Sequence, residues 1–332
     1  VVKDMKVGWN LGNTLDASPD ETGWGNPKTT KAMIDKVKEA GFNTVRIPIT
    51  WKDHIGSAPN YTIDKAWLDR VEEVVNYVLD DNMYAIINIH HDDPWIVPDC
   101  KHEGDTVHEL SIVWNQIANR FKNYSDYLIF ETLNEPRVVG SAAEWNGGTD
   151  ETRQVLNQYN LTAVNTIRST GGNNSSRFIM IPTYAASATD AAMDGLTIPN
   201  NDSKVIVSIN MYAPYYFAMD TSSLGVSTWG SDADKAALDS QMDDIYNTFV
   251  KKGTAVVLGE FGTIDKNNLS SRVEHAKYYV SAARKRGMTP IWWDNGTYAP
   301  GQGDSFGILD RNSLTWHYPD IVKALVDSAN NY

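Results

Sequence analysis

Eight runs of apolar residues, each bounded by Gly, Pro or Asn, recur along this chain of 332 residues and leave few folds open to it. They occupy residues 5–11, 44–50, 84–90, 127–135, 177–183, 204–212, 254–262 and 288–296. Most of the runs are continuously apolar rather than alternating, which is typical of strands covered on both faces of a parallel sheet. The sequence therefore predicts eight such strands.

The segments between these runs have helical patterns. Residues 29–41 offer Thr29 or Thr30 as an N-cap and Gly41 as a stop, and residues 66–82 and 109–121 each carry an apolar stripe. Strands that alternate with helices in this way predict an α/β fold, the (β/α)8 TIM barrel, as a single domain over residues 1–332. An open doubly wound sheet is the alternative, although no G-x-G-x-x-G motif follows an early strand.

The net charge argues against two classes of partner, and the single cysteine rules out a disulfide within the chain. The formal net charge is −13, and no cluster of Lys and Arg is present, so neither nucleic acid nor an anionic membrane is an expected partner. Cys100 cannot form an intramolecular disulfide, and we expect it to be buried. No stretch approaches the roughly 20 apolar residues of a spanning helix. Residues 1–10 lack a signal-peptide layout, so the chain is either cytoplasmic or the mature form of a processed protein.

Polar and aromatic side chains gather where the predicted strands end, which is the functional face of a parallel barrel. They are Asn10, Asn13, Arg46, His90, His91, Asn134, Glu135, Asn210, Tyr212, Glu260, Trp292, Trp293, Asp294 and Asn295. Among them, Glu135 and Glu260 each close an apolar strand, and a pair of carboxylates facing one substrate is what cleavage of a glycosidic bond requires. Buried salt bridges to Arg46 and Arg137 are the structural alternative.

Two details of the fourth strand affect this prediction. Glu131 lies four residues before Glu135, on the same face but deeper in the barrel, where we expect a structural, hydrogen-bonded role. Alternation prevents Asn134 and Glu135 from both pointing inward unless the strand bulges or ends there. Pro136 has no N–H, which favours an end.

The pair His90 and His91 is better explained by hydrogen bonding than by a metal. Adjacent residues on a strand point to opposite faces, and the one-sided H-x-H arrangement is absent. We therefore expect no metal and no cofactor. Both side chains are instead expected to bond to substrate or to the carboxylates, with a structural role as the alternative for one of them.

The aromatic residues favour those with a polar atom, with 11 Trp and 16 Tyr against 8 Phe. Those at strand ends or in loops are Trp9, Trp24, Trp51, Trp95, Trp145, Trp229, Trp292 and Trp293. As a group they indicate an open groove in which flat rings stack on sugars, with Trp24, Trp51, Trp95 and Trp145 as further candidates. For any single Trp, core packing is an equal alternative.

Seven motifs together resemble one known family closely. They are GWNLGNTLDA (8–17), GWGNPKTT (23–30), RIPITW (46–51), IHHD (89–92), LNEPR (133–137), GEFG (259–262) and PIWWDNG (290–296). In this order they are similar to the motifs of the glycoside hydrolase family 5 cellulases, especially the endo-β-1,4-glucanases and xyloglucanases. The resemblance spans nearly the whole chain.

The resemblance implies a retaining double displacement, with Glu135 as acid/base and Glu260 as nucleophile. It also implies that Arg46 steadies the nucleophile, Asn134 bonds the sugar 2-hydroxyl, His90 and His91 line the central subsite, Tyr212 contacts Glu260, and Trp293 forms the sugar platform. Asn13 and Asn210 are expected to bind substrate too. Because Glu135 must begin protonated, we expect the Glu260 charge to raise its pKa.

One position departs from the family pattern, and the substrate stays open. Asn210 stands where the family usually has His, so hydrogen bonding can survive there but titration cannot. The implied partner is a β-glucan polysaccharide or oligosaccharide: cellulose, mixed-linkage glucan or xyloglucan. Alternatives are a β-mannanase or another β-glycanase, and a non-catalytic polysaccharide-binding barrel. We expect a monomer, and the family's polymeric substrates imply secretion.

Overall fold

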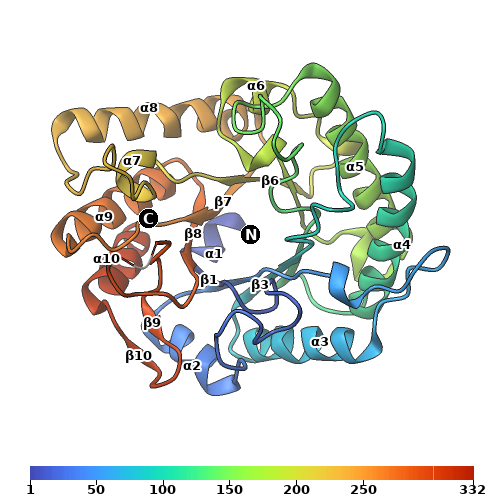
Figure 1. Cartoon of the computed structure of the whole chain (residues 1–332), viewed down its shortest axis with the longest axis horizontal. Coiled ribbons are helices and arrows are strands. Elements are labelled where there is room, and N and C mark those ends of the chain that lie inside the picture. The colour runs from blue at the N-terminus through green and yellow to red at the C-terminus, as the bar shows by residue number, and fades with distance from the viewer. Residues whose placement is uncertain (302) are drawn as a thin grey trace.

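A closed barrel of eight parallel strands forms the centre of the computed structural model, which describes residues 1–301 and 303–332 (Figure 1). The strands are β1 (Gly8–Leu11), β2 (Thr44–Ile47), β3 (Tyr84–Asn88), β4 (Leu128–Glu131), β5 (Ile179–Pro182), β6 (Val205–Asn210), β7 (Val256–Phe261) and β8 (Thr289–Asp294). Each pairs with its neighbours in chain order, and β8 closes the barrel on β1. The predicted (β/α)8 fold is confirmed.

Helices cover the outside of the barrel (Figure 1). The helices of the chain are α1 (Val2–Met5), which lies at one end of the barrel, and α2 (Lys31–Ala40), α3 (Lys65–Asp80), α4 (Glu103–Phe121), α5 (Asp150–Ser169), α6 (Asp190–Asp194), α7 (Tyr215–Ala218), α8 (Asp232–Thr248), α9 (Leu269–Lys285) and α10 (Pro319–Asn330). A small antiparallel pair, β9 (Leu309–Asp310) and β10 (Thr315–Trp316), precedes α10. Thr30 is the N-cap of α2 and accepts from the Met33 N–H, and Gly41 ends that helix with φ 111°.

The N-terminal end of the barrel interior is filled by apolar side chains, which we call the apolar layer. Its members are Ile86, Ile129, Met180, Ile206, Val257 and Ile291, with Tyr84 beside them and Val2 and Met5 of α1 packed on them. Burying one such side chain contributes about 1.5–3 kcal/mol. The short helix α1 therefore closes one end of the barrel.

The next inward-facing positions along the strands are polar, and we call Asn10, Arg46, Asn88, Glu131 and Ser208 the polar layer. All five are at most 1% exposed, although two of them carry charge. Buried charges are tolerated only when they are paired and hydrogen-bonded. The inward-facing side chains thus change from apolar to polar within two residues of one strand, as between Ile129 and Glu131.

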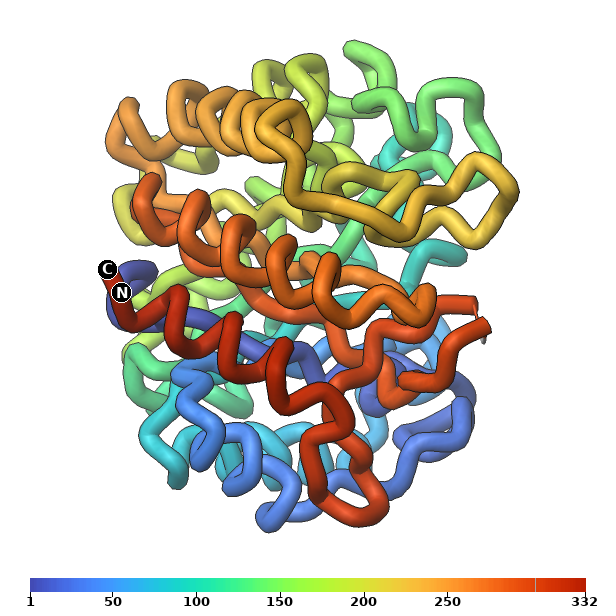
Figure 2. The backbone as a smooth tube through the Cα atoms, turned by 90° about the vertical axis from the view of Figure 1, so that its left-hand side faces the viewer, coloured from blue at the N-terminus to red at the C-terminus, as the bar shows by residue number. Residues whose placement is uncertain are grey.

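The outer helices and the chain ends complete the fold. Helices α9 and α10 run side by side, and both termini lie at the same side of the molecule (Figure 2). Within residues 1–301 and 303–332, no helix combines the length and apolar character needed to span a bilayer. Cys100 is exposed in the turn before α4, so the prediction that it is buried was wrong.

Candidate active site

A cleft of about 370 Å3 opens at the C-terminal ends of the strands. It is lined by Asn13, Trp24, His90, His91, Asn134, Glu135, Tyr212, Met219, Glu260, Trp293, Asn295, Asp304 and Phe306. Ten of these had been picked out from the sequence, nine as site residues and Asn295 as a further strand-end residue. Arg46 and Asn210 are not in this lining but bond to the carboxylates of Glu260 and Glu135, respectively. The residues predicted from the strand ends therefore do lie together, although they come from most of the length of the chain.

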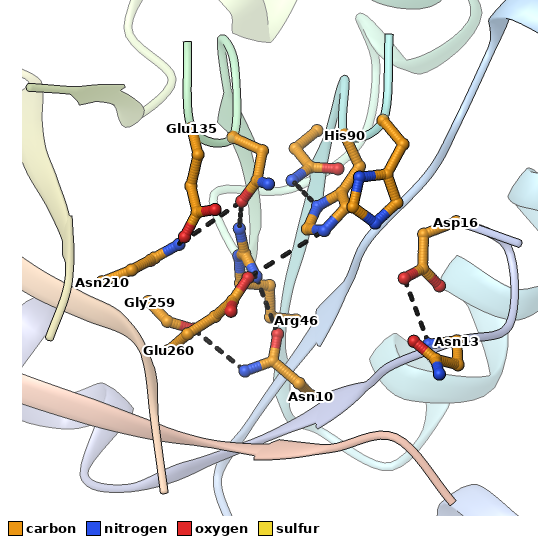
Figure 3. Close-up of polar contacts among 12 residues, drawn as sticks. Asn10, Asn13, Asp16, Arg46, His90, Glu135, Asn210, Gly259 and Glu260 are labelled. Atoms are coloured by element: carbon orange, nitrogen blue, oxygen red, sulfur yellow. Dashed lines mark hydrogen bonds and ion pairs between the residues drawn. The ribbon is translucent and has the colours of Figure 1, made fainter. Parts of the chain in front are cut away.

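Glu260, near the end of β7, is held by the Arg46 cation (Figure 3) and by the phenol of Tyr212. Arg46 Nη1 donates to its Oε2 at 2.8 Å, and the Tyr212 hydroxyl donates to its Oε1 at 2.5 Å. Burial is the largest effect and raises the pKa of Glu260 above its ordinary value, although the Arg46 charge and both hydrogen bonds act to lower it. These contacts stabilise the ionised carboxylate and fix the direction in which it points.

Glu135 lies four residues beyond the end of β4, and its carboxylate has fewer hydrogen-bond partners than that of Glu260. Asn210 Nδ2 donates to its Oε2 at 3.0 Å (Figure 3). Burial, followed by the Glu260 charge, raises the pKa of Glu135 to about 7. The predicted direction is confirmed, but burial rather than Glu260 is the larger cause. Because β4 ends at Glu131, Asn134 and Glu135 escape strand alternation, and both face the cleft.

Arg46 connects the two carboxylates of the barrel interior. It donates to Glu131 Oε1 through Nε (3.0 Å) and Nη2 (2.7 Å), in addition to its bond to Glu260. Its Nη1 and Nη2 also donate to Asn10 and Asn134, each at 2.9 Å. Glu131 thus has the structural, hydrogen-bonded role that was predicted. Arg137, the other predicted salt-bridge partner, pairs instead with Glu144 at 2.9 Å.

Both histidines face the cleft, which corrects the expectation that they point to opposite sides. The reason is that β3 ends at Asn88, so His90 and His91 follow the strand rather than belonging to it. His90 Nε2 lies 4.0 Å from Glu260 Oε2. Burial lowers the pKa of His91 to about 4 and that of His90 well below its ordinary value, so both rings are neutral at pH 7.

The same histidines and Asp16 bring three potential metal ligands within 4.8 Å of one another. The fit to an ion is poor, because Asn88 Nδ2 already donates to His90 Nδ1 at 3.0 Å. A neutral imidazole has one free lone pair, and Asn88 engages it. The Asp16 carboxylate in turn accepts from the backbone N–H groups of Asn13 and Thr14. We derive no chemical step through a metal here.

The predicted tryptophans separate into two groups. Trp293 and Trp24 line the cleft: the Trp293 ring lies parallel to His90 at 6.1 Å, and Trp24 is 47% exposed. Trp51 is fully buried and donates to the Asn88 carbonyl at 2.8 Å, so its prediction as a sugar platform was wrong.

The remaining two candidate tryptophans lie outside the lining of the cleft. Trp95 is half-buried against the core and donates to Asp92 at 2.8 Å. Trp145 is 58% exposed, and its ring lies 4.5 Å from the Arg137 guanidinium carbon.

Sequence reasoning missed three residues of the cleft. Met219 follows α7, and Asp304 and Phe306 come from the loop after β8. The Phe306 ring packs 5.5 Å from that of Tyr212. No local pattern marks these positions, since the path of a long loop brings them to the cleft. Asn88, two residues before His90, could have been found by strand alternation.

A (β/α)8 barrel with two carboxylates of unlike surroundings in one open cleft is the arrangement found in retaining and inverting glycoside hydrolases. Comparison with known proteins gives the family. Residues 6–299 match the family described as Cellulase (glycosyl hydrolase family 5), and the chain belongs to that family.

Two curated relatives are similar over nearly the whole chain. The Cellulase/esterase CelE of Acetivibrio thermocellus is 62% identical over 329 residues, which are 99% of this chain but 40% of that protein. Endoglucanase B of Clostridium cellulovorans is 60% identical over 330 residues, which are 99% of this chain and 75% of the relative. The chain thus spans less than half of the first relative's length.

Solved structures agree with the sequence comparison. A GH5-4 broad specificity endoglucanase from Clostridium acetobutylicum superimposes with a TM-score of 0.96 at 68% identity, covering 98% of both chains. A second, from Ruminococcus champanellensis with bound cellotriose, gives 0.95 at 47% identity and covers 98% of this chain and 96% of that one.

Proposed function

We propose that this chain is an endo-acting, retaining β-1,4-glucanase that hydrolyses cellulose-type β-glucans by double displacement. The observation that carries the proposal is the contrast between the carboxylates. Burial raises the pKa of both, but Glu260 is bonded by the Arg46 cation and the Tyr212 hydroxyl, which favour its charge, whereas Glu135 has a single hydrogen bond, from Asn210, and a pKa raised to about 7. Two carboxyl groups whose environments separate their pKa values identify the acid and the nucleophile.

The reaction follows from these environments in two steps. Glu135 donates its proton to the glycosidic oxygen as the bond breaks, while Glu260 attacks the anomeric carbon to form a glycosyl-enzyme. The ester no longer carries the Glu260 charge, so the pKa of Glu135 falls and its carboxylate can accept a proton from water. That water attacks the anomeric carbon and releases Glu260 and a sugar with retained configuration.

The other cleft residues have binding roles in this proposal. Arg46 holds the charge of Glu260, Asn134 receives the sugar 2-hydroxyl, and Trp293 supports the ring at the reacting sugar. Asn13, Trp24 and His91 line the same cleft and are proposed to contact neighbouring sugars. Trp145, exposed outside the lining, is a candidate for a more distant sugar.

The substrate class rests on relatives as well as on the cleft. The relatives are named cellulase or endoglucanase, and one similar structure holds cellotriose. Mixed-linkage glucan and cellulose are therefore the proposed substrates, with xyloglucan as a further one. We also propose one catalytic domain over residues 1–332, a monomer, and secretion, which polymeric substrates favour.

The test is release of reducing ends from mixed-linkage β-glucan, carboxymethylcellulose, xyloglucan and mannan. Wild type is compared with Glu135→Gln and Glu260→Gln, with Glu39→Gln on α2 as a surface control, since the Glu39 side chain is 75% exposed. We expect activity on glucans that both cleft substitutions abolish and the control keeps. Wild type that binds glucan without cleaving it would instead establish a binding barrel, and preference for mannan would establish a mannanase.

A further inference from the structure

The side-chain amide of Asn88 has only one possible orientation. Asn88 is the last residue of β3, and its Oδ1 accepts from the backbone N–H of Ile49 at 2.9 Å. A backbone N–H can only donate, so the atom facing it must be the amide oxygen. The Nδ2 group therefore faces the other two partners, Glu131 Oε1 at 2.9 Å and His90 Nδ1 at 3.0 Å.

This orientation decides which nitrogen of His90 carries the proton. Nδ1 receives a hydrogen bond from Asn88, so it must present a lone pair, and a neutral ring then carries its proton on Nε2. The ring is neutral because burial lowers the pKa of His90, and the charges of Arg46 and Arg137 act in the same direction. Asn88 is itself fixed by Ile49 and Glu131, so the arrangement is rigid.

We propose that Asn88 is a positioning residue that holds His90 as the Nε2–H tautomer, with the N–H directed into the cleft. His90 Nε2 lies 4.0 Å from Glu260 Oε2 (Figure 3), and its ring lies parallel to that of Trp293 with centroids 6.1 Å apart. An N–H there attracts an ionised Glu260 and can donate to a sugar hydroxyl. In the other tautomer a lone pair would face the carboxylate and repel it.

The catalytic consequence rests on the proposed function, but the tautomer does not. Asn88→Asp reverses the preference, because a carboxylate beside Nδ1 accepts a hydrogen bond where the amide donated one. We expect His90 to become Nδ1–H or imidazolium in this variant. For comparison, loss of an outer partner of a metal-bound histidine costs roughly 10- to 100-fold. We expect a loss of about this size in kcat/KM for Asn88→Asp.

The experiment is imidazole 15N NMR of the whole chain, in wild type, Asn88→Asp and a matched control. The chain has 7 histidines, and the missing signal of a His90→Gln variant assigns His90. The control is Asn160→Asp, since Asn160 is equally buried but bonds Thr132 and Pro182 rather than a histidine.

Wild type should show a protonated Nε2 and a bare Nδ1, which change in Asn88→Asp and stay in Asn160→Asp. A wild-type His90 protonated on Nδ1 would overturn the inference, and so would an unchanged signal in folded Asn88→Asp. If that variant does not fold, Asn88→Ser should give a mixture of tautomers. An inactive wild type that has the Nε2–H form would refute the proposed function and leave the inference intact.

Discussion

Three strands of this barrel, β3, β4 and β6, contribute to both interior layers, yet the two layers have different roles. In the apolar layer Ile129 and Ile206 pack against other side chains and α1. Two residues further along β4 and β6, Glu131 and Ser208 bond to each other in the polar layer. The first layer stabilises the barrel, and the second holds the Glu260 carboxylate through Arg46, at a cost in burial of polar groups. On β4 and β6, a side chain that packs the apolar end of the barrel and one that supports the cleft are therefore only two residues apart.

The largest expected effect is on Glu260, which rests on the polar layer through Arg46. Glu260→Ala should lower kcat roughly 10^4-fold or more, because removal of a nucleophile eliminates the covalent route. The free energy of unfolding of Glu260→Ala should stay close to that of wild type. Steady-state kinetics on mixed-linkage glucan and urea unfolding measure the two quantities. Retention of more than a few per cent of wild-type activity would contradict the assignment.

Arg46→Met should lower activity and stability together. It leaves the carboxylates of Glu131 and Glu260 buried without their cation, and breaking a buried ion pair costs about 3–5 kcal/mol. The double variant Arg46→Met with Glu131→Gln should recover part of the free energy of unfolding, since one uncompensated charge is removed. Strictly additive unfolding energies would show that Arg46 and Glu131 are not coupled.

Ile129→Ala in the apolar layer should lower stability alone. Truncation of a buried Ile costs about 2–5 kcal/mol, and Ile129→Val costs about 1 kcal/mol. Activity per folded molecule should stay within about twofold of wild type, because Ile129 belongs to the apolar layer and does not line the cleft. Chemical unfolding and an assay at a temperature where both proteins are folded provide the comparison. A large loss of kcat would mean that the layers are not separable.

The smallest effect concerns the pH profile set by Asn210. Its hydrogen bond favours the charged form of Glu135, so Asn210→Ala should raise the pKa of that carboxyl further. The protonated acid would then persist to higher pH, and the basic limb of kcat/KM should move up by about one pH unit. Asn210→His, when charged, should move the limb down. Unchanged limbs in both variants would show that Asn210 does not set this pKa.

The eight barrel strands could be predicted from the sequence, because strands buried on both faces appear as continuous apolar runs. Glu135 and Glu260 were then identified as the carboxylates that close two of these runs. The exact strand ends were not, and they decide which side chains face the cleft: β3 stops at Asn88, so His90 and His91 face the same side. The local sequence pattern does not show at which residue a strand ends.

Loop paths were also beyond sequence reasoning. Trp51 and Trp24 both follow motifs near the N-terminus, but Trp51 is buried and Trp24 lines the cleft. Phe306 reaches the cleft from a loop with no distinguishing pattern, and Cys100 is exposed because its turn lies on the surface. Tertiary packing, rather than residue type, determined these outcomes.

The central claim is that Glu260 is the nucleophile and Glu135 the acid/base. A 2-deoxy-2-fluoro cellobioside with a good leaving group should trap the glycosyl-enzyme, and mass spectrometry of peptides should locate the label. The account predicts one 2-deoxy-2-fluorocellobiosyl group bound to the peptide that contains Glu260. A label on Glu135, or hydrolysis with inverted configuration and no trapped intermediate, would contradict it.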